Sequence, residues 1–230
     1  MAKINLSKYA YERLLERERH VVNPGPVITI SREYGCPSKP IAALLTDLIN
    51  EKYAGKNKWH WISKEILEET ARKLGLTPRE IKHIFEYKER NLLEDLLIGQ
   101  EKKNYYRSDW SIRKTLGEVI HATAMEGHCI IVGRAGVALT RDIEASLHVK
   151  LIAPEQWRTV QVTRIHDIPY EKASKLIREM DNKRKKFIEY YLKKEASNSI
   201  FDVIFNCSTL SKEEVAQTIL KMARQKKLSK

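Results

Sequence analysis

The chain of 230 residues is long enough to bury one sizeable core, and a composition of 42% hydrophobic and 31% charged residues excludes a disordered or collagen-like polypeptide. No apolar run could span a membrane, and the N-terminal residues lack the apolar core of a signal peptide, so we expect a cytoplasmic protein without a membrane partner. The net charge of +12 calls for an anionic partner, and nucleic acid, lipid headgroups and nucleotide phosphates would all satisfy it.

Residues 1–25 have an amphipathic pattern that predicts a helical extension, which could pack on the main domain or on a second subunit of a homodimer. Residues 26–230 alternate short apolar, β-branched runs with long helical patterns, as βαβ units around a parallel sheet do. Most of these runs are almost continuously apolar, which is typical of strands covered on both faces. We therefore expect one α/β domain with a five-stranded parallel sheet flanked by helices. The predicted strands are Val27–Ser31, Trp59–Ile62, Cys129–Val132, Leu147–Ile152 and Phe201–Asn206.

The first strand leads into the turn Ser31-Arg-Glu-Tyr-Gly-Cys-Pro-Ser-Lys39-Pro40, and a helical run begins at Ile41. Strand, turn, lysine and helix form the order of a mononucleotide-binding loop, in which backbone N–H groups, the helix N-terminus and the lysine neutralise phosphate. The match to the pattern G-x-x-x-x-G-K-[ST] is partial, because Glu33 and Ser38 stand at its glycine positions. An ordinary βα connection with a proline at the helix start explains the segment about equally well.

Basic residues also follow the second and third predicted strands. Gly133 and Arg134 come directly after the third strand, and Lys64 comes after the second. Ligands of open α/β sheets bind at the carboxyl ends of the strands, where an arginine can hold a phosphate with two hydrogen bonds. A surface or capping role is the alternative for Arg134, and a solvated lysine is the alternative for Lys64.

A long helical pattern from Pro169 to Lys193 carries Arg178, Asp181 and Arg184 on one face. Any one of these residues is most simply explained as part of a solvated helix face. The set is more informative, because basic clusters follow several elements in the chain order that a phosphate-binding site requires.

The three cysteines, Cys36, Cys129 and Cys207, lack the spacing of a metal site or a redox pair. No His/Cys cluster has metal-ligand spacing either, so we expect no direct metal ligands in the protein. An odd number of unpatterned cysteines fits a reducing compartment.

Over about residues 26 to 222 the chain resembles the cytidylate kinase-like family, a group of nucleoside monophosphate kinases within the P-loop NTPases. The segments that carry the resemblance are Ile28-Thr-Ile-Ser-Arg-Glu-Tyr-Gly35, Trp61-Ile-Ser-Lys-Glu-Ile-Leu67, Ile130-Ile-Val-Gly-Arg-Ala-Gly136 and Arg178-Glu-Met-Asp-Asn-Lys-Arg184, together with the closing Asn206-Cys-Ser-Thr-Leu-Ser211.

The resemblance implies a P-loop NTPase-like three-layer fold and a reaction in which ATP phosphorylates a nucleoside monophosphate, CMP or dCMP. Magnesium (Mg2+) would accompany ATP and be held largely through water. A helical insertion at about 63–127 would lie on the acceptor side, and residues at about 155–195 would form a lid.

The resemblance also implies roles for individual residues. Those expected to bind ATP are Gly35, Cys36, Ser38 and Lys39, and those expected to bind the acceptor are Gly133, Arg134 and Lys64. The expected catalytic residues are Lys39, Arg178 and Arg184, with Arg158, Arg164 and Asp181 as further lid residues.

The turn departs from the family pattern in ways that keep a second hypothesis open. Pro37 and Ser38 replace glycines, and Pro37 and Pro40 have no N–H to donate to a phosphate. The alternative is therefore a catalytically inactive family member that binds nucleotide or nucleic acid as a regulatory module. Nucleic acid remains a possible but less favoured partner.

Overall fold

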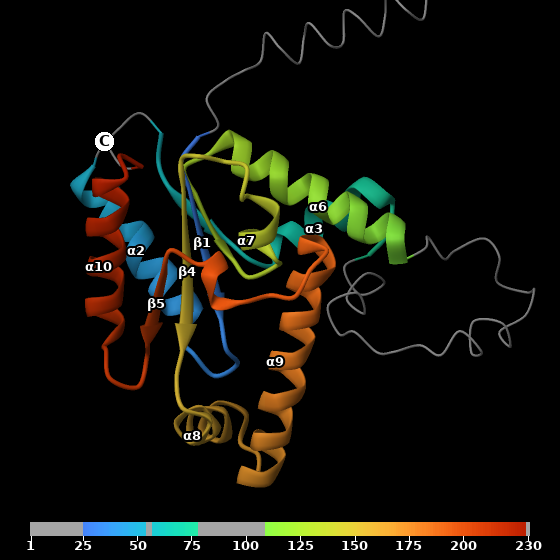
Figure 1. The fold of residues 1–230 in the computed structure, drawn as a ribbon, viewed down its shortest axis with the longest axis vertical. Coiled ribbons are helices and arrows are strands. Elements are labelled where there is room, and N and C mark those ends of the chain that lie inside the picture. Colours follow the sequence, from blue (N-terminus) through green and yellow to red (C-terminus); the bar gives the residue numbers. More distant parts are fainter. Residues whose placement is uncertain (1–24, 54–56, 78–108, 229–230) are drawn as a thin grey trace, which may run out of the picture.

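A parallel sheet of five strands forms the centre of the protein in a computed structural model that describes residues 25–53, 57–77 and 109–228. The strand order is β2-β3-β1-β4-β5, and every neighbouring pair is parallel (Figure 1). The predicted fold class is thus confirmed. The strands are β1 Val27–Arg32, β2 His60–Ile62, β3 Cys129–Val132, β4 Ser146–Ile152 and β5 Val203–Asn206.

The central strand β1 determines where the functional residues gather. Its first residues are fully buried, because β3 and β4 flank it and helices cover both faces of the sheet. The register pairs Ile30 with Val132 and Arg32 with Leu151. The residues that follow these three strands therefore meet at one edge of the sheet, the carboxyl edge.

Helices cover both faces of the sheet, as Figure 1 shows. On one face lie α2 (Ser38–Lys52) and α10 (Lys212–Gln225). On the other lie α3 (Glu65–Leu74), α6 (Asp109–Glu126) and α7 (Gly136–Leu139). The helices α8 (Glu155–His166) and α9 (Tyr170–Leu192) extend beyond the carboxyl edge, and the last turns of α9 return to pack on the second face (Figure 1).

Several element boundaries differ from the sequence predictions by a few residues. The helix α2 begins at Ser38 rather than Ile41, because proline at position 40 is tolerated in a first helical turn. The strand β5 begins at Val203, because a 3-10 turn over Asn198–Ile200 precedes it. The start of α10 follows its capping box, in which the Ser211 hydroxyl accepts a hydrogen bond from the Glu214 N–H at 3.1 Å.

Two predicted regions fall largely outside the described residues. They are the N-terminal extension, of which residues 1–24 are not described, and residues 78–108 of the acceptor-side insertion. Among the helices that the structure does describe, none combines the length and apolar character needed to cross a membrane.

Candidate functional site

The loop between β1 and α2 has a backbone shape that requires glycine at position 35. The φ angle of Gly35 is +96°, and a Cβ atom there would lie 3.0 Å from the Cβ of Arg158. The next residue, Cys36, is buried against Cys207 at the end of β5. Contact with the Cys207 thiol and burial raise the pKa of Cys36, so that this thiol stays neutral and serves as packing.

Most N–H groups of this loop already have acceptors within the protein. The Tyr34 N–H donates to an Asp181 carboxylate oxygen at 2.6 Å. The N–H groups of Cys36 and Ser38 donate to carbonyl oxygens of the loop itself, at 3.2 and 2.9 Å. Because the prolines have no N–H, the loop has few backbone donors left for a phosphate.

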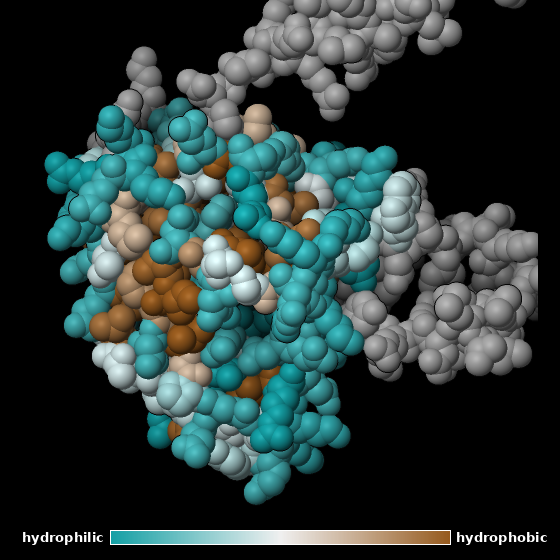
Figure 2. Space-filling view, in the orientation of Figure 1, coloured by the Kyte–Doolittle hydropathy of each residue, from teal (hydrophilic) through white to brown (hydrophobic). Residues whose placement is uncertain are grey.

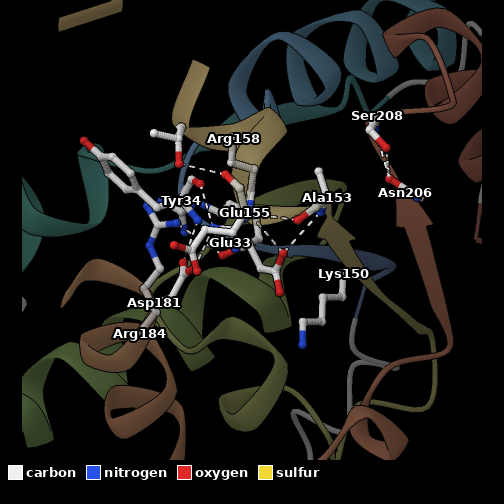
Figure 3. Close-up of polar contacts among 12 residues, drawn as sticks. Glu33, Tyr34, Lys150, Ala153, Glu155, Arg158, Asp181, Arg184, Asn206 and Ser208 are labelled. Carbon is white, nitrogen blue, oxygen red and sulfur yellow. Dashed lines mark hydrogen bonds and ion pairs between the residues drawn. The ribbon is translucent and has the colours of Figure 1, made fainter. Parts of the chain in front are cut away.

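Below the loop lies a group of three charged residues, which we call the loop clamp: Arg158, Glu33 and Asp181. The Arg158 side chain is 7% exposed, and its guanidinium lies 2.6 Å from Asp181 and 3.3 Å from Glu33 (Figure 3). Its guanidinium also donates to the carbonyl oxygens of Ala153 and Tyr34, at 2.9 and 3.0 Å. The clamp joins β1, β4, α8 and α9 around the loop, and its one guanidinium pairs with both carboxylates.

A first cavity has a volume of about 570 Å³ and opens over the loop. We call it the donor cavity because the residues expected to bind ATP line it. Gly35, Cys36, Ser38 and Lys39 line it, and the exposed Lys39 lies in the first turn of α2. Its opposite wall is largely apolar and comes from α8 and the loop before α10. The apolar residues of this wall are Trp157, Val162, Ile165 and Leu210.

A second cavity has a volume of about 330 Å³ and lies between the carboxyl edge and the middle of α9. We call it the acceptor cavity because Gly133 and Arg134, which are expected to bind the acceptor, line it. Among the charged side chains of its lining, positive ones outnumber the two acidic ones, Glu33 and Asp181. The positive ones are Arg32, Arg134, Lys150, Arg184 and Lys185. In the space-filling view the surface between β4 and α9 is hollowed and largely hydrophilic (Figure 2).

Three of these residues form what we call the arginine cluster: Arg32, Arg134 and Arg184. Burial, followed by the charges of Arg184 and Arg134, lowers the pKa of Arg32 to about 9. Burial and the charge of Arg184 likewise lower the pKa of Arg134 to about 10. All three guanidiniums remain charged at neutral pH, and their mutual repulsion makes the cavity a site for anions.

A glycine and two hydrogen bonds to backbone carbonyl oxygens position the side chains of the arginine cluster. Gly133 has a φ angle of +76°, and a Cβ atom there would lie 1.7 Å from an Nη atom of Arg32, so only glycine leaves room for that guanidinium. The Arg184 guanidinium donates to the Arg32 carbonyl at 3.2 Å, and Arg134 donates to the Ser63 carbonyl at 3.2 Å.

The structure brings most of the predicted site residues to these cavities. The predicted residues that line at least one of the two cavities are Gly35, Cys36, Ser38, Lys39, Gly133, Arg134, Asp181 and Arg184. Four others line neither: Lys64, Arg158, Arg164 and Arg178. Arg178 is 71% exposed along its side chain and pairs with Glu155 at 2.9 Å, while Lys64 and Arg164 are exposed at the start of α3 and the end of α8.

Sequence reasoning missed Arg32, Lys150 and the clamp residue Glu33 as members of the site. The sequence did contain a signal for Arg32 and Glu33, because charged side chains at the end of a buried parallel strand lie at the ligand-binding edge. Lys150 had no such signal, since it lies within β4.

Comparison with known proteins agrees with this geometry. A family model described as "Cytidylate kinase-like family" matches residues 27–209. The chain belongs to this family. It is 26% identical over 194 residues to a cytidylate kinase of Sulfurisphaera tokodaii, covering 84% of this chain and 92% of that protein. Membership of the family supports a nucleotide kinase activity.

Two solved structures show the same fold at low sequence identity. An uncharacterized protein from Eubacterium ventriosum matches with a TM-score of 0.62 and 18% identity, over 87% of this chain and 98% of the other. A shikimate kinase from Acinetobacter baumannii, solved in complex with shikimate, matches with a TM-score of 0.50 and 16% identity, over 90% of this chain and 97% of the other.

Proposed function

We propose that this family member transfers the γ-phosphoryl group of ATP to a nucleoside monophosphate, with CMP or dCMP as the acceptor. The observation that carries the proposal is that the donor and acceptor cavities share two wall residues, Arg32 and Arg184. Two anionic substrates bound in these cavities would therefore meet beside positive charge. The curated cytidylate kinase relative supports the choice of CMP or dCMP.

The proposed reaction needs positioning and charge neutralisation rather than a covalent nucleophile. Lys39, in the first turn of α2, would neutralise the β- and γ-phosphates of ATP. Arg134 would hold the acceptor phosphate, and Arg184 would bind the group in transfer. Arg178 would join them only if its pair with Glu155 broke, because that pair now holds it outside both cavities.

Magnesium would be supplied with ATP and would neutralise the charge of its phosphates. In the described part of the chain, no group of three His, Cys, Asp or Glu side chains could hold a metal ion. The acidic residues nearest the loop, Glu33 and Asp181, are engaged by Arg158. This set of residues fits an ion held by phosphate oxygens and water rather than by protein ligands.

The test is an assay of ADP release with CMP, dCMP, UMP, AMP and shikimate as separate acceptors. We expect turnover with CMP or dCMP, and a loss of about 10²- to 10⁴-fold in kcat for Lys39→Ala, because a charge beside the transferred group is removed. Lys52→Ala, which changes an exposed lysine at the other end of the same helix, is the matched control and should keep full activity.

A second function is favoured by one specific observation, the shortage of free N–H donors in the loop. A family member with such a loop could bind nucleotide for regulation without transferring phosphate. Wild-type protein that binds ATP yet releases no ADP with any of these acceptors would establish this alternative and rule out the kinase.

A further inference from the structure

The Arg32 side chain occupies the boundary between the two cavities. It is the last residue of β1, the central strand, and it lines both the donor and the acceptor cavity. Of the other side chains in the arginine cluster, Arg134 lines only the acceptor cavity, whereas Arg184 lines both. Gly133 leaves space for the Arg32 guanidinium at this position.

Within the described residues, nothing in the protein neutralises this guanidinium. No carboxylate pairs with it, and its nearest charged neighbours are the other two arginines of the cluster. Arg158, by contrast, has two carboxylate partners, Glu33 and Asp181. A partly buried cation without a counter-charge is costly, and an anionic ligand on either side would relieve that cost.

The shortage of free N–H groups in the loop explains why a positively charged side chain is needed here. Phosphate loops normally neutralise bound phosphates with a series of backbone N–H groups. Here the N–H groups of Tyr34, Cys36 and Ser38 already have protein acceptors, and Pro37 and Pro40 have none to offer. Charge neutralisation at the transferred group must then come from side chains that reach it.

We propose that Arg32 contacts both substrates at once, binding the γ-phosphate of the donor with one edge of its guanidinium and the acceptor phosphate with the other. The proposal rests on the proposed phosphoryl transfer and identifies, beside Arg184, a residue that holds the two reacting groups together. The planar guanidinium has donors on more than one edge, which a lysine ammonium cannot reproduce.

In the reaction, an oxygen of the acceptor phosphate forms a bond to the γ-phosphorus. The bond from the γ-phosphorus to the bridging oxygen breaks, and the electron pair stays on the β-phosphate of the ADP that leaves. Arg32 keeps its proton throughout and stabilises the negative charge on the oxygens of the transferred group.

Two calorimetric titrations test this without relying on turnover. The first measures the Kd of the magnesium complex of AMP-PNP, which occupies the donor cavity. The second measures the Kd of inorganic phosphate with AMP-PNP saturating, so that phosphate reports the acceptor cavity. For Arg32→Ala we expect both Kd values to rise about 10-fold or more, since a charge-assisted contact is lost on each side.

The controls separate a bridging residue from a residue of one cavity. Lys39→Ala should raise only the Kd of AMP-PNP, and Arg134→Ala should raise only the Kd of phosphate. Arg141→Ala, which removes an exposed arginine that lines neither cavity, should change neither. If Arg32→Ala does not fold, Arg32→Lys takes its place, and it should recover only part of both affinities.

A rise in only one Kd, or in neither, would overturn the bridging role while leaving the kinase reaction intact. Arg32→Ala could raise both Kd values while the wild type phosphorylates none of the five acceptors. That result would support the role of Arg32 in binding both ligands and would reject the proposed reaction instead. Circular dichroism of each variant confirms that the comparison is made on folded protein.

Discussion

Two arginines near the loop between β1 and α2, the buried Arg158 and the partly exposed Arg32, differ in what balances their charge. Arg158 contacts both carboxylates of the loop clamp and holds the loop to α8 and α9. Arg32 has no carboxylate partner in the described residues and lies among the other arginines of its cluster. The comparison teaches that a paired arginine can hold elements of the fold together, whereas an arginine without a carboxylate partner favours binding of an anion and costs stability while none is bound.

The largest effect should come from breaking the clamp. We expect Arg158→Met to lower the free energy of unfolding by about 3–5 kcal/mol, because Glu33 and Asp181 would lose the cation that pairs with them in a partly buried site. Urea denaturation measures the change. Arg164→Met, an exposed position on the same helix, is the control, and a loss under about 1 kcal/mol for Arg158→Met would argue against a structural clamp.

The next effect concerns ligand affinity in the cluster. We expect Arg134→Ala to raise the KM for the monophosphate acceptor about 10- to 100-fold, because a charge-assisted contact to its phosphate is lost. The KM for ATP should change little, since Arg134 does not line the donor cavity. Steady-state kinetics with Arg72→Ala as a surface control would check this, and equal increases in both KM values would contradict the separation of the two cavities.

Replacing Arg32 should have a smaller effect on the free energy of unfolding than replacing Arg158, and of opposite sign. We expect Arg32→Met to raise the free energy of unfolding by about 1–2 kcal/mol, because burial and repulsion from Arg134 and Arg184 both oppose the wild-type charge. Urea denaturation without phosphate would show the gain. Added pyrophosphate should then stabilise the wild type more than the variant, and a destabilised variant would break the comparison with Arg158.

The smallest effect is expected at Arg178. Arg178→Ala should change the free energy of unfolding by no more than about 0.5 kcal/mol, because its pair with Glu155 is exposed to solvent. Thermal or urea unfolding would detect a larger change. A loss of more than 1 kcal/mol would mean that this pair, and not only the clamp, holds α9 to α8.

The strands were predictable because burial between two helical layers forces each to be apolar along its length. All five were located within one or two residues of their observed ends. Boundaries that depend on tertiary context were less predictable. The early start of α2 and the late start of β5 follow from a tolerated proline and from a 3-10 turn that hydrophobic patterns do not reveal.

The members of the candidate site were more predictable than their partners. Arg134, Asp181 and Arg184 stood out because of their spacing and their positions after strands or on one helix face. The sequence contained no sign that Asp181 would receive the Tyr34 N–H, since these residues are 147 positions apart. The number of loop N–H groups left free to bind a phosphate could therefore not be judged from the prolines alone.

The sequence by itself determined the parallel sheet, the family and the kinds of residue that gather at the carboxyl edge, because burial periodicity and motif spacing are local properties of the chain. Only the folded protein decided which arginine is neutralised and which is not. The charge state and the free energy of a guanidinium depend on neighbours brought in from other elements, as Glu33 and Asp181 are for Arg158, and as further arginines are for Arg32.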